Sequence, residues 1–484
     1  MRSDLTVARG WLKSFGLAAG AALLPAAAGL LYAATSAAPC DRPERTAAID
    51  ASQATPAQTS PDRLTIVLVG DTGFNTTDAK VDAEGIYKGK QVTSFTDALA
   101  GVAGAVDGDL AFVNLETVVT DRNDLGPEGR GKGTFHFRSH PAALKALIDS
   151  GFNLFALANN HAYDYGAQGI EETLYHLALA NAERPIAVAG IGSNFEEAIR
   201  PGCLDLGGAR FAFSAIGIMT GDQPQSRAGP NKAGQASYRD RPDFVAAVDK
   251  LVAMPADYRI LSIHYGVEGR VVPDERQLAD WRRFAAEEKG IDLIVGHHPQ
   301  VAQGVELNGK SLIFYGLGNF LHPGAAVPTR FGLCRDYGLM AKLHLARIDG
   351  AWRVEAIEAI PLTNTQARPE LFAAAEGTKR IYALNHLAAG LDDGKNAKGV
   401  RFSPRADGSG LYCADGAAAL GGEIGTLCQG WQQPSEPDKA VAAKIASACA
   451  DKPFYGKPIL VKRKVPQRTR RNPSPSPFGP AGPQ

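Results

Sequence analysis

The chain has 484 residues, of which 45% are apolar and 21% charged, a composition typical of a soluble globular protein with room for about two to three domains. Lys and Arg together number 51, and so do Asp and Glu, so the formal net charge is zero. This balance excludes a global field that would attract nucleic acid, and we expect no nucleic-acid partner.

Residues 1–38 predict an export segment outside the folded body. Arg2, Arg9 and Lys13 precede a mostly apolar run from residue 15 to 38, the pattern of a signal peptide. At about 24 residues the run is also long enough to span a bilayer, so a cleaved signal peptide and a retained signal anchor both stay open, and Pro39 favours retention. Either way, we expect an exported protein, membrane-anchored or periplasmic.

Residues 39–63 are rich in Ala, Pro, Ser and Thr without periodicity and predict a linker. The six cysteines contain no C-x-x-C pair, which argues against a thiolate zinc site. In an oxidising compartment they can form disulfides. We expect two of the three late cysteines to pair, although the sequence does not say which two: Cys413, Cys428 and Cys449.

From residue 64 onward, short apolar runs alternate with helical patterns. The runs predict strands at Leu64–Val69, Leu110–Val113, Leu154–Leu157, Ile186–Ala189, Phe211–Ile216, Ile260–Ile263, Leu293–Val295 and Leu312–Phe314. The intervening segments predict helices at Phe95–Val106, Ala142–Ser150, Gly169–Ala182, Phe244–Met254 and Leu278–Lys289. Such alternation is typical of an α/β fold with a largely buried sheet.

A β-hairpin and a C-terminal extension complete the predicted organisation. Gly338–Ile348 and Trp352–Ile360 alternate around an Asp-Gly turn. Residues 366–456 read as an extension packed on the core, with one helical stretch at Leu371–Leu391. Residues 457–484 form a basic, Pro-rich segment that we expect to be a disordered tail, with contact to an anionic polymer or lipid as the alternative.

Polar clusters follow several of the predicted strands, at Gly70–Gly73, Asn114–Glu116, Asn159–Gly166, His264–Glu268 and Gly296–Glu306. Each of the first two has a structural explanation of its own, since Asp71 can serve as a turn residue and Asn114 with Glu116 as a satisfied polar edge. However, the carboxyl ends of strands in an α/β sheet meet in one crevice. We therefore expect these clusters to surround a common site.

The third cluster is the hardest to explain by packing alone, because polar side chains at the mouth of a buried strand are costly unless each finds a partner. Asn160 can ligate a hard cation through its carbonyl oxygen. His161 can act as a general acid or bind phosphate, and Asp164 is close enough in sequence to hold the imidazole.

Together the clusters offer carboxylate, amide and imidazole donors, a set that suits Zn²⁺, Mn²⁺ or Fe as one ion or a pair. The chain contains neither a G-x-S-x-G nucleophile elbow nor a P-loop, which argues against a serine hydrolase and an ATP-driven ligase. We expect the remaining histidines to be structural: His136, His140, His176, His322, His344 and His386.

Taken in order, these motifs resemble the bacterial capsule synthesis proteins of the CapA type, which are associated with poly-γ-glutamate production. The resemblance covers about residues 64–362, including Phe137-Arg138 and the segment Tyr315–Phe320. It implies a domain over residues 64–365 with the layered α/β/β/α sandwich of the metallo-dependent (calcineurin-like) phosphatases.

The resemblance also implies a role for each site residue. The metal ligands would be Asp71, Glu116, Asn160, His264, His297 and Gln300. His161 would be the catalytic general acid oriented by Asp164, and Arg138 and Asn159 would bind substrate. The family usually has histidine where this chain has Gln300, a weaker ligand, so a second metal ion is doubtful.

The function that the resemblance implies is capsule or exopolymer biosynthesis of the poly-γ-glutamate type in the cell envelope. The chemistry would be metal-assisted hydrolysis or transfer at a phosphate or amide centre. Expected partners are an anionic polymer such as poly-γ-glutamate, a capsule synthesis and export complex, and the membrane through the N-terminal segment. Two alternatives stay open: a non-catalytic polymer-binding assembly component, and an exported metal-dependent phosphodiesterase unrelated to capsule.

Overall fold

The computed structural model describes residues 62–74, 80–88, 90–128, 135–218, 224–285, 290–324 and 332–451. The predicted export segment, nearly all of the linker and the basic tail lie outside these residues. Within the described ranges, no helix is both long enough and apolar enough to cross a membrane.

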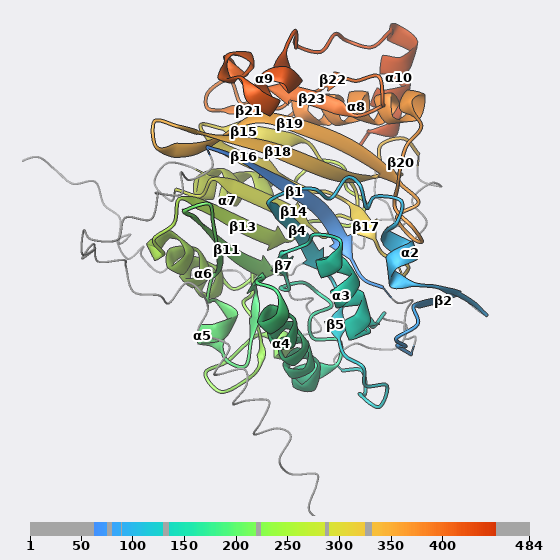
Figure 1. Cartoon of the computed structure of the whole chain (residues 1–484), viewed down its shortest axis with the longest axis vertical. Helices are drawn as coiled ribbons and strands as arrows, with labels where there is room; N and C mark the ends of the chain where they lie inside the picture. Colours follow the sequence, from blue (N-terminus) through green and yellow to red (C-terminus); the bar gives the residue numbers. More distant parts are fainter. Residues whose placement is uncertain are drawn as a thin grey trace, which may run out of the picture.

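The larger of two main sheets has the strand order β22-β23-β19-β18-β1-β4-β7-β8, with β17 beside β1 and β20 beside β19 (Figure 1). Its strands are β1 (Arg63–Thr72), β4 (Leu110–Leu115), β7 (Leu154–Ala156), β8 (Ala187–Ala189), β17 (Asn319–Leu321), β18 (Gly338–Ile348), β19 (Ala351–Thr363), β20 (Glu370–Leu371), β22 (Ser403–Pro404) and β23 (Gly410–Cys413). Strands β1, β4, β7 and β8 are parallel, and β18 runs antiparallel to β1.

The second sheet has the order β10-β11-β13-β14-β16-β15-β21, and β11, β13, β14 and β16 are parallel. Its strands are β10 (Gly202–Leu206), β11 (Ala209–Gly217), β13 (Tyr258–His264), β14 (Leu293–His297), β15 (Val305–Asn308), β16 (Ser311–Phe314) and β21 (Ala397–Gly399). Short pairs are formed by β2 (Ile86–Lys88) with β3 (Gln91–Thr93), β5 (Val118–Val119) with β6 (Arg138–Ser139), and β9 (Ile191–Gly192) with β12 (Gly234–Gln235).

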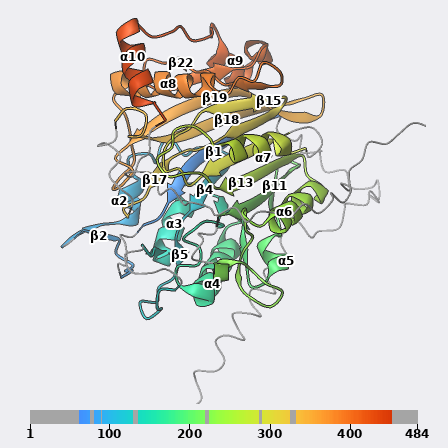
Figure 2. The same cartoon turned by 180° about the vertical axis from the view of Figure 1, so that it is seen from behind.

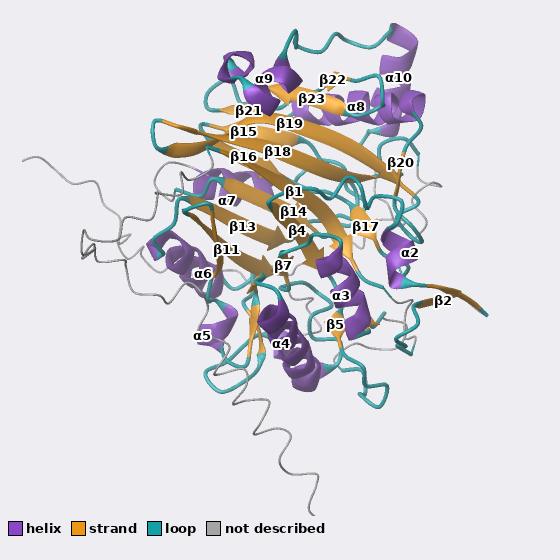
Figure 3. Ribbon diagram, viewed as in Figure 1, coloured by secondary structure: helices purple, strands orange, loops and turns teal. Residues whose placement is uncertain are grey.

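Helices cover the outer faces of the two sheets, and the C-terminal helices lie over β18 and β19 at one end of the sandwich, as Figures 2 and 3 show. They are α2 (Phe95–Leu99), α3 (Pro141–Asp149), α4 (Gly166–Glu183), α5 (Phe195–Ala198), α6 (Arg241–Ala253), α7 (Glu275–Ala285), α8 (Ala374–Ala389), α9 (Gly422–Cys428) and α10 (Lys439–Ala448). Apolar side chains of α2, α3 and α4 pack on the first sheet, and those of α6 and α7 pack on the second.

The buried side chains confirm the predicted α/β/β/α layers. Along β1, Ile66 and Leu68 enter the core between the two sheets, whereas Val67 and Val69 enter the core under the helices. Successive residues of a strand point to opposite faces, so a strand buried on both faces reads as a continuous apolar run. The same division holds in β13, where Ile260 faces the first sheet.

The predicted strands and the hairpin are confirmed, with ends that differ by a few residues. The predicted helix Phe95–Val106 is wrong beyond Leu99, where α2 ends. Gly101 explains the early end in part, since a Cβ there would come within 2.4 Å of the Pro369 carbonyl oxygen. Glycine is also a poor helix former.

Residues after 366 contribute strands to both sheets through β20, β21, β22 and β23. In Figure 1 this segment, coloured orange to red, lies over β18 and β19. The disulfide Cys413–Cys428 confirms that two of the three late cysteines pair, and Cys449 pairs instead with Cys334. The extension is therefore covalently tied to the segment that precedes β18.

Candidate metal centre

Strand register brings polar residues to the carboxyl ends of both sheets. In the first sheet Asp71 on β1 lies opposite Asn114 on β4. In the second sheet His264 on β13 lies opposite His297 on β14. The two sheets face each other, so these ends meet at one edge of the sandwich, as the motif order predicts.

Asp71 joins the two sheets at this edge. Its Oδ1 lies 3.2 Å from His297 Nδ1 and 3.9 Å from His264 Nδ1. The Asn114 amide donates to the same Oδ1 at 2.8 Å and lies 3.2 Å from His264 Nδ1. The main-chain N–H of His298 donates to Asp71 Oδ2 at 3.3 Å.

Glu116 lies on the other side of His264. Its Oε1 is 3.6 Å from His264 Nε2 and 3.9 Å from His161 Nε2. Asn160 Oδ1 lies 2.7 Å from His264 Nε2. Ligand atoms of Glu116, His264 and His298 all lie within 4.8 Å of one another. The structure thus brings together five of the six predicted ligands, namely Asp71, Glu116, Asn160, His264 and His297.

Burial fixes the protonation state at the centre of this cluster. Asp71 and His264 are fully buried, and Glu116 and His297 are 1% exposed. Burial, followed by repulsion from the neighbouring histidines, holds the pKa of His264 well below its usual range. His264 is therefore neutral at physiological pH, and a neutral imidazole is the form that binds a metal.

Buried atoms of the cluster without a hydrogen-bond partner among the residues described include Asn114 Oδ1 and both ring nitrogens of His297. A buried polar atom without a partner costs about 1 to 3 kcal/mol. The mixture of carboxylate, amide and imidazole donors suits Mn²⁺, Zn²⁺ or Fe. The residues present therefore fit a divalent metal.

The turn after β14 decides which side chains reach the cluster. His298 and Gln300 have positive φ angles of 90° and 58°, which non-glycine residues adopt rarely. Over the described part of the chain, no hydrogen bond or ion pair links Gln300 to the predicted ligands, and its side chain is half-buried. His298 instead joins Glu116 and His264.

His161 is held beside the cluster by Asp164. Its Nδ1 lies 2.7 Å from Asp164 Oδ2, which also accepts the main-chain N–H of Phe137 at 2.7 Å. The Phe137 ring lies 4.2 Å from the His161 ring, centroid to centroid. The His161 imidazole is therefore held on two sides, by the Asp164 carboxylate and by the Phe137 ring.

The two predicted substrate-binding residues make mainly other contacts. The Asn159 amide donates to the carbonyls of Leu115 and Leu157, and Asn159 Oδ1 accepts the N–H of His161. The Arg138 guanidinium stacks over the Tyr165 ring at 4.9 Å. It also donates to the Arg122 carbonyl oxygen at 3.3 Å. Asn159 thus braces the loop that carries His161.

Sequence reasoning did not assign His298 or His322 to the metal site. His322 is buried directly after β17, and its Nε2 lies 3.9 Å from Glu116 Oε2. Burial lowers the pKa of His322 to about 4. A usable signal was present, since β17 begins within the Leu-Gly-Asn-Phe segment and pairs in parallel with β1, with Asn319 opposite Asp71 and Leu321 opposite Thr72.

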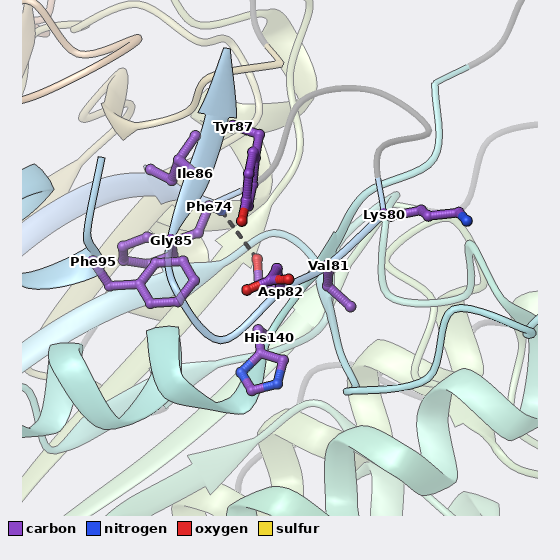
Figure 4. A pocket seen from close by; sticks show the side chains of 10 residues that line it. Phe74, Lys80, Val81, Asp82, Gly85, Ile86, Tyr87, Phe95 and His140 are labelled. Atoms are coloured by element: carbon purple, nitrogen blue, oxygen red, sulfur yellow. Dashed lines mark hydrogen bonds between the residues drawn. The ribbon is translucent and has the colours of Figure 1, made fainter. Parts of the chain in front are cut away.

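A small pocket lies near this edge, lined by Phe74, Lys80, Val81, Asp82, Gly85, Ile86, Tyr87, Phe95, Ser139 and His140 (Figure 4). Its volume is about 20 Å³, room for about one water molecule. The Phe74 N–H donates to Ser139 Oγ at 3.0 Å on its wall. None of the predicted ligands lines it, so we do not assign it to substrate.

Comparison with known families agrees with the motif order. The profile of the family described as "Bacterial capsule synthesis protein PGA_cap" matches residues 65–323, more than half of the chain. The chain belongs to the PGA_cap family. The matched range begins in β1 and ends just after β17, so it holds every predicted ligand and both catalytic candidates of this PGA_cap member.

Curated relatives carry capsule-related names. The chain is 28% identical over 258 residues to the capsule biosynthesis protein CapA of Bacillus anthracis, an alignment that covers 51% of the chain and 56% of that protein. It is 29% identical over 240 residues to the PGA biosynthesis protein CapA of Bacillus subtilis, covering 48% and 58%. The chain thus spans about half the length of the curated relatives it matches.

Among solved structures, the calcineurin-like phosphoesterase YfkN of Bacillus subtilis aligns with 62% of this chain and 90% of its own, at 14% identity and a TM-score of 0.36. A likeness of this size supports no conclusion about function. The layered architecture rests on the strand order and the core contacts given above.

Proposed function

We propose that this PGA_cap protein is a metal-dependent hydrolase or transferase of capsule or exopolymer assembly, acting at a phosphate or amide centre of an anionic polymer of the poly-γ-glutamate type. The observation that carries the proposal is the meeting of Asp71, Glu116, His264 and His297 at one buried edge, with His161 directed at Glu116 from the side.

In this proposal Asp71, Glu116, Asn160, His264 and His297 hold the cation, with His298 as a further ligand. A bound divalent cation supplies Lewis-acid polarisation of a phosphoryl or carbonyl oxygen and of the attacking water. We do not include Gln300 among these ligands, because over the described residues no hydrogen bond or ion pair joins its half-buried side chain to the cluster.

His161 acts as the general acid. Asp164 lies at Nδ1, so the nitrogen on the side of Glu116 is Nε2. A protonated Nε2 can donate to a leaving alkoxide oxygen or amine nitrogen, which avoids expelling an unstable anion. Asn159 and Phe137 fix the loop and the ring, so the donor stays aligned.

We place the protein in the cell envelope, with the basic end of residues 1–38 in the cytoplasm and the folded body outside. Support comes from the sequence of that segment and from the capsule-related names of the relatives. A reporter enzyme that is active only outside the cytoplasm should be active when it is fused after residue 484. If that fusion is inactive, and a reporter that is active only in the cytoplasm works at the same position, this placement is contradicted.

The test of the activity uses the full-length chain, purified with Mn²⁺ or Zn²⁺ and assayed on p-nitrophenyl and alkyl phosphodiesters and on a γ-glutamyl anilide. His264→Ala should remove bound metal and all activity. His161→Gln should keep the metal and lose more activity on the alkyl ester than on the p-nitrophenyl ester, because p-nitrophenolate leaves without a proton.

The same variants, returned to the producing cell, separate the alternatives. If His264→Ala and His161→Gln abolish capsule together with hydrolysis, the protein is an assembly enzyme. Capsule that is lost when the protein is deleted but restored by both variants would mean that it acts as a non-catalytic polymer-binding component. Hydrolysis lost on deletion with capsule unchanged would indicate a phosphodiesterase unrelated to capsule.

A further inference from the structure

A second group of metal-ligating side chains lies apart from the candidate metal centre. Glu172 and His176 are four residues apart on α4 and therefore share one face of the helix. Asp121 follows β5 on the neighbouring segment. Each residue offers one ligand atom, and the three atoms lie within 4.8 Å of one another.

His176 is the residue that points to a ligand. Its side chain is only 10% exposed, and its Nε2 lies 3.8 Å from Glu172 Oε2. That separation is too long for a hydrogen bond, and Nε2 has no hydrogen-bond partner anywhere in the described part of the chain. A buried imidazole nitrogen directed at a carboxylate without reaching it leaves space for an ion between them.

Two neighbouring side chains, Thr120 and Arg122, hold Glu172 in place. Thr120 Oγ1 donates to Glu172 Oε2 at 2.9 Å. Arg122 is the nearest competing cation, at 3.6 Å from Glu172 Oε1. Its guanidinium is already engaged by both carboxylate oxygens of Asp124, at 3.1 and 2.9 Å. Arg122 can keep that bidentate pair while a second cation approaches Glu172.

We propose that Asp121, Glu172 and His176 bind one divalent transition cation, Zn²⁺ or Mn²⁺. Two carboxylates and one imidazole form a ligand set for these ions. Small side-chain movements bring atoms within 4.8 Å of one another onto an ion at about 2.0 to 2.2 Å. The expectation that His176 is structural is thereby replaced by a ligand role.

This cation site lies between two segments that carry residues of the candidate metal centre. β5 begins two residues after Glu116, and α4 begins two residues after Asp164. An ion held by Asp121 on one side and by Glu172 and His176 on the other clamps together the two segments that carry these residues. The site shares no residue with the candidate metal centre, and the inference does not depend on the proposed activity.

The test counts Zn²⁺ ions per full-length chain by equilibrium dialysis and elemental analysis. Asp121→Asn and His176→Gln should each remove one ion, or weaken its binding at least 10-fold, and should reduce the rise in Tm caused by Zn²⁺. The control is Glu171→Gln, which removes the same charge from an exposed neighbour on α4 and should change neither quantity.

Equal stoichiometry and affinity in Asp121→Asn and Glu171→Gln would overturn the proposal. Asp121 is exposed, so this comparison decides the matter even if His176→Gln fails to fold by circular dichroism. His264→Ala, measured in parallel, should remove a different ion. If His264→Ala does not remove an ion, only the proposed function is contradicted. Binding at Asp121, Glu172 and His176 is measured separately, by comparing Asp121→Asn with Glu171→Gln.

Discussion

His161 Nδ1 and Asp164 Oδ2 lie 2.7 Å apart, one turn along the same buried loop, and the same Oδ2 accepts the N–H of Phe137. Asp164 is fully buried. One carboxylate thus orients the imidazole and anchors the segment whose ring packs against it. This arrangement is what a general acid requires, because the donor must be held in one tautomer and one direction.

Replacing Asp164 by Asn should lower the hydrolytic activity about 100-fold while the chain keeps its metal, because the imidazole loses the charge that orients it. Activity and metal content, measured on the same preparation, check this. The matched control is Asp149→Asn, a carboxylate whose side chain is 51% exposed, which should leave both unchanged. Loss of metal in Asp164→Asn would mean that Asp164 supports the ligands instead of the acid.

The turn after β14 predicts unequal effects at His298 and Gln300. Both have positive φ, so glycine can replace either without backbone strain. His298→Gly should weaken metal binding about 10-fold or more, because a ligand atom is lost. Gln300→Gly should change it by less than about 2-fold. Titration of Mn²⁺ into both variants measures the two affinities. If Gln300→Gly binds Mn²⁺ more weakly than His298→Gly, Gln300 is the ligand.

The pair Arg282–Glu306 should matter for stability. Arg282 donates from Nε and Nη2 to the fully buried Glu306 carboxylate, with distances down to 2.7 Å, and from Nη2 to the Leu391 carbonyl. Arg282→Met leaves a buried carboxylate without its cation, so the free energy of unfolding should fall by about 3 to 5 kcal/mol. Urea unfolding followed by circular dichroism measures it.

Arg283→Met is the control for that prediction, since the Arg283 side chain is 43% exposed and pairs with Asp280 at the surface. Its effect should stay within about 0.5 kcal/mol. An equal loss in the two variants would show that the helix surface, and not the tie to Glu306, accounts for the destabilisation.

Glu358 should make stability fall in acid. Burial raises the pKa of this carboxyl group, but hydrogen bonds from His344 and Arg405 outweigh burial and lower the pKa to about 2. A depressed folded-state pKa stabilises the fold above the usual value near 4.5, and that contribution disappears as the pH falls toward 2. The contribution at neutral pH should be about 2 to 3 kcal/mol.

The measurement compares Glu358→Gln with the unchanged chain by urea unfolding at pH 6 and at pH 2.5. The stability difference between them should be large at pH 6 and mostly gone at pH 2.5. Glu370→Gln serves as the control, because that carboxylate is about half exposed and pairs only loosely with Arg368 at 3.8 Å. A pH-independent difference for Glu358→Gln would contradict the linkage.

The sequence predicted the elements of the core well because their signals are local. A strand buried on both faces, such as β1, needs a run of apolar residues, and a hairpin such as β18–β19 needs alternation around a turn. The helix predicted from Phe95 runs past the end of α2 at Leu99, and at position 101 stands glycine, a poor helix former, where a Cβ would meet Pro369, more than 250 residues away in sequence.

By itself, the sequence determined that polar residues end the buried strands and that Asp71, Glu116, His161, His264 and His297 belong to one family pattern. Only the tertiary structure decided which side chains meet. The packing of two sheets sets distances between residues far apart in sequence, and it brings a ligand atom of His298 within 4.8 Å of those of Glu116 and His264. For the same reason, only the tertiary structure identifies His322 and the group around His176 as neighbours of other potential metal ligands.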